Sequence, residues 1–260
     1  MTTTTVTDGN GTTHFFDVLG RFSDGLQITR TGPNTQRITN RQLGRAMLFV
    51  PQAVSLVEQV PMLIYFHGHH GPEKIEGYVA SKTERDFRPL LKDKKVLLVA
   101  PQGGPKSKFG GLGDAAGIST LLFRAMQTAF AGPSARPVPD PVPKPPSLIL
   151  AGFSGGGSTL NRVVLDAKAD YLGRIAEVWC LDSMYSGEGK RWVAWAKDAA
   201  NAKKILRVRV SKEEGTGDPR AQAKVVRDAK KASAIDNIDI ADTVDTTHEK
   251  LPGMFIKQWL

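Results

Sequence analysis

Short, continuously apolar segments constrain the fold of this chain most. Residues 61–66 read Pro-Met-Leu-Ile-Tyr-Phe, and similar runs occupy 96–100 and 147–151. A run without polar alternation is typical of a strand buried on both faces of a sheet. Segments with helical spacing lie between these runs. This alternation predicts an α/β fold, a doubly wound, mostly parallel sheet with helices on both faces. We also expect strands at 14–19, 45–50, Ile175–Leu181, 204–210 and 235–240, and helices at 78–92, 118–130, 191–202, 219–232 and 252–260.

The domain organisation is simple. The Thr-rich residues 1–13 are expected to form a frayed tail, and 14–260 a single domain. Seven prolines between Pro133 and Pro146 restrict that stretch to extended or polyproline-like backbone. Because the alternation resumes directly after it, we interpret 133–146 as a surface excursion of the domain rather than a linker.

Composition excludes several classes of protein. The 260 residues include one cysteine, Cys180, so a disulfide framework and a multi-cysteine metal site are excluded. No stretch approaches the roughly 18 apolar residues of a membrane span. The net charge of +9 is spread from Arg21 to Lys257 without interleaved aromatics, which indicates a solvated basic surface and no specific nucleic-acid partner. The first residues lack the apolar core of a secretory signal, so we expect a cytoplasmic protein, or a secreted one from which a signal was removed.

The motif that carries chemistry is Gly-Phe-Ser-Gly-Gly at 152–156, which fits G-x-S-x-G. It lies between an apolar strand and an amphipathic helix, where a tight turn lifts the serine hydroxyl clear of the sheet. A phosphate loop is the alternative for this glycine-rich turn, but Ser158 stands where that motif needs lysine. The pattern therefore favours Ser154 as a nucleophile over a phosphate loop or a plain turn.

At these residues the sequence resembles the α/β-hydrolase superfamily of serine hydrolases. The resemblance covers 45–260 and includes the serine turn, the His67-Gly68 pair after an apolar strand, and Phe49-Val-Pro51 before it. It implies the α/β-hydrolase fold and a Ser-Asp-His triad acting with no cofactor. It also implies a small-molecule or polymeric ester as substrate.

The superfamily order is Ser, then Asp or Glu, then His, and His248 is the histidine downstream of Ser154. We therefore expect His248 to be the general base. Asp182 follows strand Ile175–Leu181 directly and is the expected acid, because open α/β sheets build their sites at the carboxyl ends of strands. Asp218, Glu213 and Glu214, after the next strand, are the alternative acids.

The resemblance also implies an oxyanion hole, which needs two N–H donors about 3 Å from the ester carbonyl oxygen. One donor is expected from Gly155, directly after the nucleophile. The other is expected from the loop after 61–66, at His69 following Gly68. His70 and Tyr78 are candidates for lining the acyl pocket.

Two other functions remain open at this point. A metal-dependent hydrolase could use the cluster of His67, His69 and His70 with Glu73, although Gly71 stands where the H-x-H-x-D-H pattern requires aspartate. A non-catalytic protein could use the same fold for binding, with the Pro-rich segment as a contact. The combination of a turn serine, a downstream histidine and an aspartate at a strand end favours the serine esterase.

Overall fold

The structure of the chain is a computed structural model that describes residues 3–18, 23–32, 35–69, 75, 86–104, 107–132, 137–213 and 217–260. For 23–32, 35–43, 217 and 242 it describes the backbone alone. Within these residues the strands are β1 (Thr3–Asp8), β2 (Gly11–Asp17), β3 (Ser23–Gly32), β4 (Thr35–Leu43), β5 (Arg45–Pro51), β6 (Met62–Phe66), β7 (Leu97–Pro101), β8 (Leu148–Phe153), β9 (Ile175–Leu181), β10 (Ile205–Ser211) and β11 (Ile238–Val244).

The α-helices of the described residues follow the strands in alternation. They are α2 (Arg88–Leu91), α3 (Ala115–Ala131), α4 (Gly157–Val164), α5 (Glu188–Lys197), α6 (Gly217–Ser233) and α7 (Leu251–Trp259). Short 3₁₀ helices complete the connections: η1 (Val57–Gln59), η3 (Gly110–Gly113), η4 (Ser154–Gly156), η5 (Asp170–Arg174) and η6 (Ala199–Asn201). No described helix combines the length and the hydropathy that crossing a membrane requires.

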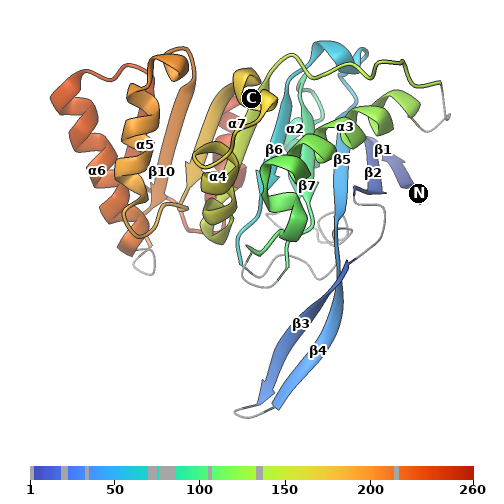
Figure 1. The fold of residues 1–260 in the computed structure, drawn as a ribbon, viewed down its shortest axis with the longest axis horizontal. Coiled ribbons are helices and arrows are strands. Elements are labelled where there is room, and N and C mark those ends of the chain that lie inside the picture. Colours follow the sequence, from blue (N-terminus) through green and yellow to red (C-terminus); the bar gives the residue numbers. More distant parts are fainter. Residues whose placement is uncertain are drawn as a thin grey trace.

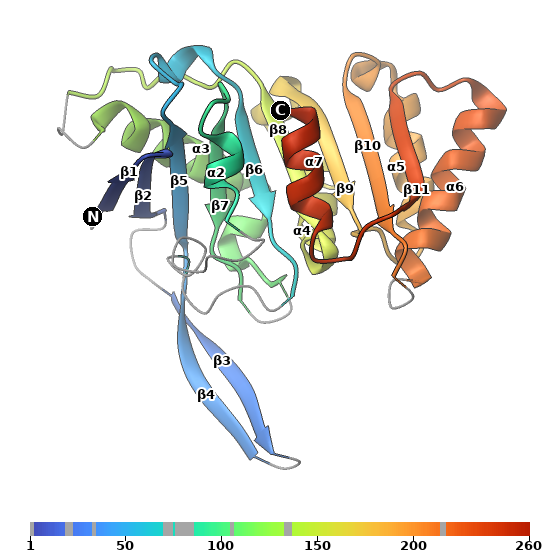
Figure 2. The same ribbon diagram turned by 180° about the vertical axis from the view of Figure 1, so that it is seen from behind.

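Nine of the eleven described strands form one sheet in the order β1-β2-β5-β7-β6-β8-β9-β10-β11. From β7 to β11 the neighbours pair in parallel, whereas β1, β2 and β5 are antiparallel additions at one side. Helices cover both faces: Figure 1 shows α3, α4, α5 and α6 on one face, and Figure 2 shows α2 and α7 on the other. The expected doubly wound, mostly parallel α/β fold is confirmed.

Alternation along β6 shows how one strand serves two hydrophobic cores. Met62, Ile64 and Phe66 face the core beneath α3 to α6, while Leu63 and Tyr65 face the core beneath α2 and α7. Successive side chains of a strand point to opposite faces, so a strand buried on both sides must be apolar throughout. This is why the continuous run at 61–66 specifies a central strand.

The amino-terminal region differs from the expected frayed tail over 1–13. Residues Thr3–Asp8 form an exposed edge strand that pairs with β2. Threonine and valine favour extended backbone, and the pairing supplies the hydrogen bonds, although no burial of β1 accompanies it.

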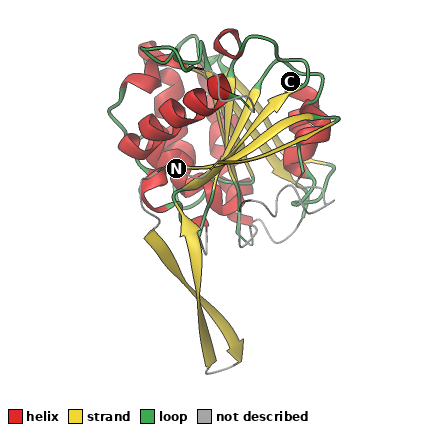
Figure 3. Ribbon diagram, turned by 90° about the vertical axis from the view of Figure 1, so that its right-hand side faces the viewer, coloured by secondary structure: helices red, strands yellow, loops and turns green. Residues whose placement is uncertain are grey.

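A second difference is the hairpin of β3 and β4, which pair in a sheet of their own. Figure 3 shows the hairpin extending away from the main body. The expected helix at 78–92 lies largely outside the described residues, and its described part contains α2.

Candidate active site

The candidate site lies at the point where the order of the strands in the sheet reverses. Strand β6 has β7 on one side and β8 on the other, and Phe66 of β6 pairs with Gly152 of β8. Crossovers that leave in opposite directions open a crevice at the carboxyl ends of such strands. Ser154 follows β8 at this edge, and His67 follows β6. Asp182 and His248 follow β9 and β11 at the same edge.

A sharp turn carries Ser154. The serine has a φ of +49°, in the left-handed region that L-residues seldom adopt, and it links β8 through η4 to α4. Its side chain is half-buried. A strained serine between a strand and a helix is the geometry expected for the G-x-S-x-G turn.

The glycines around Ser154 allow the turn to approach its neighbours. A Cβ on Gly68 would lie 2.8 Å from Cβ of Ser154, and a Cβ on Gly156 would overlap the carbonyl oxygen of Phe66. A Cβ on Gly157 would overlap the carbonyl oxygen of Ser183. Because the clashing atoms of Phe66 and Ser183 belong to the backbone, a side chain at 156 or 157 would push the turn away from β6 or β9.

Asp182 is fully buried at the end of β9, with a φ of +47°. Its carboxylate accepts hydrogen bonds from the Ser211 backbone N–H (2.9 Å) and the Ser211 hydroxyl (2.6 Å). Its Oδ2 lies 2.8 Å from Nδ1 of His248. The Asp182 carboxylate is therefore oriented by the neighbouring strand β10 and by the imidazole together.

The ring of His248 is held between the carboxylate and the serine turn. Its Nδ1 faces Asp182, and the ring packs on Phe153 with centroids 4.6 Å apart. Phe153 directly precedes Ser154, so the imidazole stands beside the turn. With Nδ1 engaged by a carboxylate, the other ring nitrogen, Nε2, is the one left for proton transfer.

The alternative acids have other partners. Asp218 accepts a hydrogen bond from the Ser186 backbone N–H at 2.9 Å, and from the Gln222 side chain. Glu213 accepts from the backbone N–H of His248 at 2.8 Å, a contact that fixes the loop. Glu214 lies outside the described residues. Of these carboxylates, Asp182 is the one placed against the imidazole in the described structure.

His67 connects the loop after β6 to the loop after β7 through hydrogen bonds. Its Nδ1 bonds the Gly68 carbonyl oxygen at 2.7 Å, and its Nε2 accepts from the Gly103 backbone N–H at 3.0 Å. These roles fix a neutral tautomer with the proton on Nδ1, and both nitrogens are occupied. No metal-binding cluster occurs among the described residues, while His70, Glu73 and Tyr78 lie outside them.

Tyr185 is a site residue that the sequence analysis did not single out. Its hydroxyl donates to the Asp182 backbone carbonyl at 3.1 Å. Burial raises the pKa of Tyr185, while a hydrogen bond with the Ser154 side chain lowers it. The phenol therefore lies between the two residues. Ser211 was also not predicted as a site residue; it directly follows the predicted strand 204–210 and is the last residue of β10, which lies beside β9.

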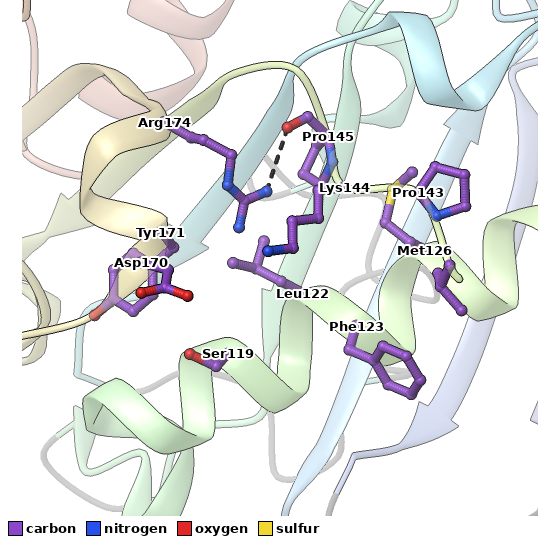
Figure 4. Close-up of a pocket in the computed structure, with 11 residues that line it drawn as sticks. Ser119, Leu122, Phe123, Met126, Pro143, Lys144, Pro145, Asp170, Tyr171 and Arg174 are labelled. Carbon is purple, nitrogen blue, oxygen red and sulfur yellow. Dashed lines mark hydrogen bonds between the residues drawn. The ribbon is translucent and has the colours of Figure 1, made fainter. Parts of the chain in front are cut away.

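The Pro-rich segment lies at the amino ends of the parallel strands, whereas Ser154, Asp182 and His248 lie at their carboxyl ends. It leads into the amino end of β8, and Ser147 accepts a backbone hydrogen bond from Met62 at the start of β6. Residues 142–145 line a cavity of about 160 Å³ against α3 and η5, where Arg174 donates to the Pro145 carbonyl at 3.3 Å (Figure 4). The described part, 137–146, is therefore remote from Ser154.

Solved structures include a protein with a similar architecture. No protein-family model and no curated protein matches the sequence. Among solved structures, a ferulic acid esterase aligns with a TM-score of 0.51 and 12% identity, over 90% of this chain and 96% of its own.

Two other solved structures align less closely. A feruloyl esterase module from Clostridium thermocellum has a TM-score of 0.48 and 12% identity, over 93% of this chain and 89% of its own. An IroE-like serine hydrolase from Shewanella oneidensis has a TM-score of 0.48 and 11% identity, over 82% of this chain and 73% of its own. With the strand order, the helices on both faces and the serine turn, the first alignment shows that this chain has the α/β-hydrolase fold.

Proposed function

We propose that this protein is a serine hydrolase that cleaves carboxylic esters through an acyl-enzyme intermediate. Ser154 is the nucleophile, His248 the general base and acid, and Asp182 the residue that orients His248. The observation that carries the proposal is the 2.8 Å contact between Nδ1 of His248 and the buried Asp182 carboxylate, beside a serine at a φ of +49°.

The chemistry follows from these positions. Ser154 Oγ attacks the ester carbonyl carbon, and Nε2 of His248 takes the hydroxyl proton. The bond to the alcohol then breaks, and His248 returns the proton to the leaving oxygen. Water repeats the two steps on the acyl-enzyme and releases the acid. Asp182 stabilises the positive charge that His248 carries in between, and its burial strengthens that interaction.

The oxyanion that forms on the ester carbonyl needs hydrogen-bond donors beside Ser154, at the carboxyl ends of the strands. We assign the backbone N–H groups of Gly155 and His69 to this task. In support, a Cβ on Gly155 would lie 2.5 Å from Nε2 of His69, so these residues are in direct contact beside Ser154. Preorganised donors of this kind contribute about 2.7–4 kcal/mol each to transition-state stabilisation.

The test is hydrolysis of p-nitrophenyl acetate, butyrate and octanoate and of methyl ferulate, the last because one structural neighbour is a ferulic acid esterase. We expect at least one ester to be cleaved, and the Ser154→Ala variant to lose about 10³-fold or more of kcat with an unchanged Tm. An active Ser154→Ala variant would contradict the proposal. Inactive wild-type protein with normal folding would favour a binding role for the fold.

A further inference from the structure

Ser107 combines two unfavourable features in one residue. It follows β7 in the loop toward η3, the residue is 1% exposed, and its φ is +55°. Its hydroxyl has no hydrogen-bond partner within the described structure. A buried polar group without a partner destabilises a fold, and so does left-handed backbone at a residue with a side chain.

Ser107 lies beside the residues to which we assign the oxyanion hole. A Cβ built on Gly155 would lie 2.7 Å from Oγ of Ser107 and 2.5 Å from Nε2 of His69. The Ser107 hydroxyl and the His69 ring therefore meet at the α-carbon of Gly155. Gly155 and His69 are the residues to which we assign the oxyanion hole, so the hydroxyl lies beside that site.

Local structure alone does not account for serine at this position. Glycine would adopt a φ of +55° without strain, and the same loop already has glycine at 103, 104 and 110. Alanine would remove the buried hydroxyl. Strain and unsatisfied polar groups of this kind collect at functional sites, where a ligand supplies the missing partner.

We propose that the Ser107 hydroxyl is a third donor of the oxyanion hole, donating a hydrogen bond to the ester carbonyl oxygen as negative charge develops on it. The inference rests on the proposed esterase function. No proton is transferred by Ser107; its hydrogen bond only strengthens as the oxygen becomes anionic. In the structure the hydroxyl is covered, with the His69 ring beside it, and His69 is exposed. The carbonyl oxygen would have to reach the hydroxyl from the side that the His69 ring occupies.

The test compares Ser107→Ala with Ser119→Ala on an ester that the wild-type protein cleaves in the experiment proposed above. The Ser119 hydroxyl is exposed and bonds the Ala115 carbonyl within α3, so its loss should leave kcat unchanged. Loss of one oxyanion donor lowers kcat by about 10²–10³-fold. For Ser107→Ala we expect a kcat loss of this order with little change in KM and an unchanged or higher Tm. The affinity for a boronic acid that mimics the tetrahedral intermediate should fall by a similar factor.

Ser107→Gly is the second variant, because glycine tolerates the φ of +55° and so protects the test against misfolding. It should show the same kcat loss with a raised Tm. Wild-type activity that persists in both variants would overturn the role of Ser107 and leave the esterase function standing. A fall in Tm that parallels the loss of activity would assign Ser107 a structural role instead. Absence of activity in the wild type would contradict the esterase function itself.

Discussion

Nδ1 of His248 lies 2.8 Å from Oδ2 of Asp182, a carboxylate with no exposed surface. The two residues are 66 positions apart in the sequence and follow different strands. Ser211, at the end of the strand between them, holds the carboxylate with two further hydrogen bonds. This relationship separates Asp182 from the other acidic residues near the site.

The Asp182→Asn variant should lose about 10³–10⁴-fold of kcat, because an amide neither fixes the imidazole tautomer nor stabilises its positive charge. The matched variant is Asp218→Asn, which changes a carboxylate bonded to the Ser186 backbone and Gln222. Steady-state kinetics on both variants measure the difference. Near-normal activity of Asp182→Asn beside an inactive Asp218→Asn would reverse the assignment.

Glu213→Gln should change kcat only slightly. The Glu213 carboxylate accepts from the backbone N–H of His248, and the glutamine carbonyl can accept the same hydrogen bond. The imidazole keeps its partner Asp182 in this variant. A loss of kcat as large as that of Asp182→Asn would show that Glu213 acts on the ring.

Gly157→Ala should disturb the serine turn, because its Cβ would overlap the carbonyl oxygen of Ser183. We expect the free energy of unfolding to fall by about 1–3 kcal/mol, as for other overpacked sites, together with a loss of kcat. Gly173→Ala is the control, since a Cβ there meets nothing within 4 Å. Urea unfolding measures the free energy of unfolding of the two variants. Equal values would contradict the close contact between α4 and the residues that follow β9.

Stability should depend on pH through His14. Burial lowers the pKa of His14 in the folded protein below the ordinary 6.5, so the unfolded chain binds the proton more tightly. Stability is then highest above pH 6.5 and falls as the pH drops toward the folded-state pKa, by at most about 1.4 kcal/mol per pH unit. Comparing urea unfolding of wild type and His14→Gln between pH 7.5 and 5 tests this. The variant should show a shallower pH dependence, and identical slopes would contradict the contribution of His14.

The sequence predicts the central sheet well, because its strands are buried on both faces. Strand β9 occupies the predicted Ile175–Leu181, and α3 extends the predicted 118–130 by a few residues at its start. Strands β1, β3 and β4 were missed. The side chains of β1 are exposed, and β3 pairs with β4 alone, so neither pattern carries the burial signal that marks a central strand.

The residues of the candidate site also fall into two groups, those that the sequence predicts and those that it does not. Ser154 could be proposed from the G-x-S-x-G pattern, Asp182 from its place directly after an apolar strand, and His248 from the residue order of the superfamily that the sequence resembles. Tyr185 and Ser107 could not, because their significance depends on contacts between loops. The phenol of Tyr185 returns to the Asp182 carbonyl, and Ser107 meets Gly155 from a different connection. Such contacts have no periodicity in the sequence.

The most direct test of the account is reaction of the pure protein with a fluorophosphonate probe, read by intact mass and peptide mapping. Only a serine activated by a neighbouring base reacts readily with such a probe. We predict one adduct per chain, on Ser154, and no adduct on a Ser154→Ala variant with the same circular dichroism spectrum. A folded wild-type protein that forms no adduct, or forms it on another residue, would contradict Ser154 as the nucleophile.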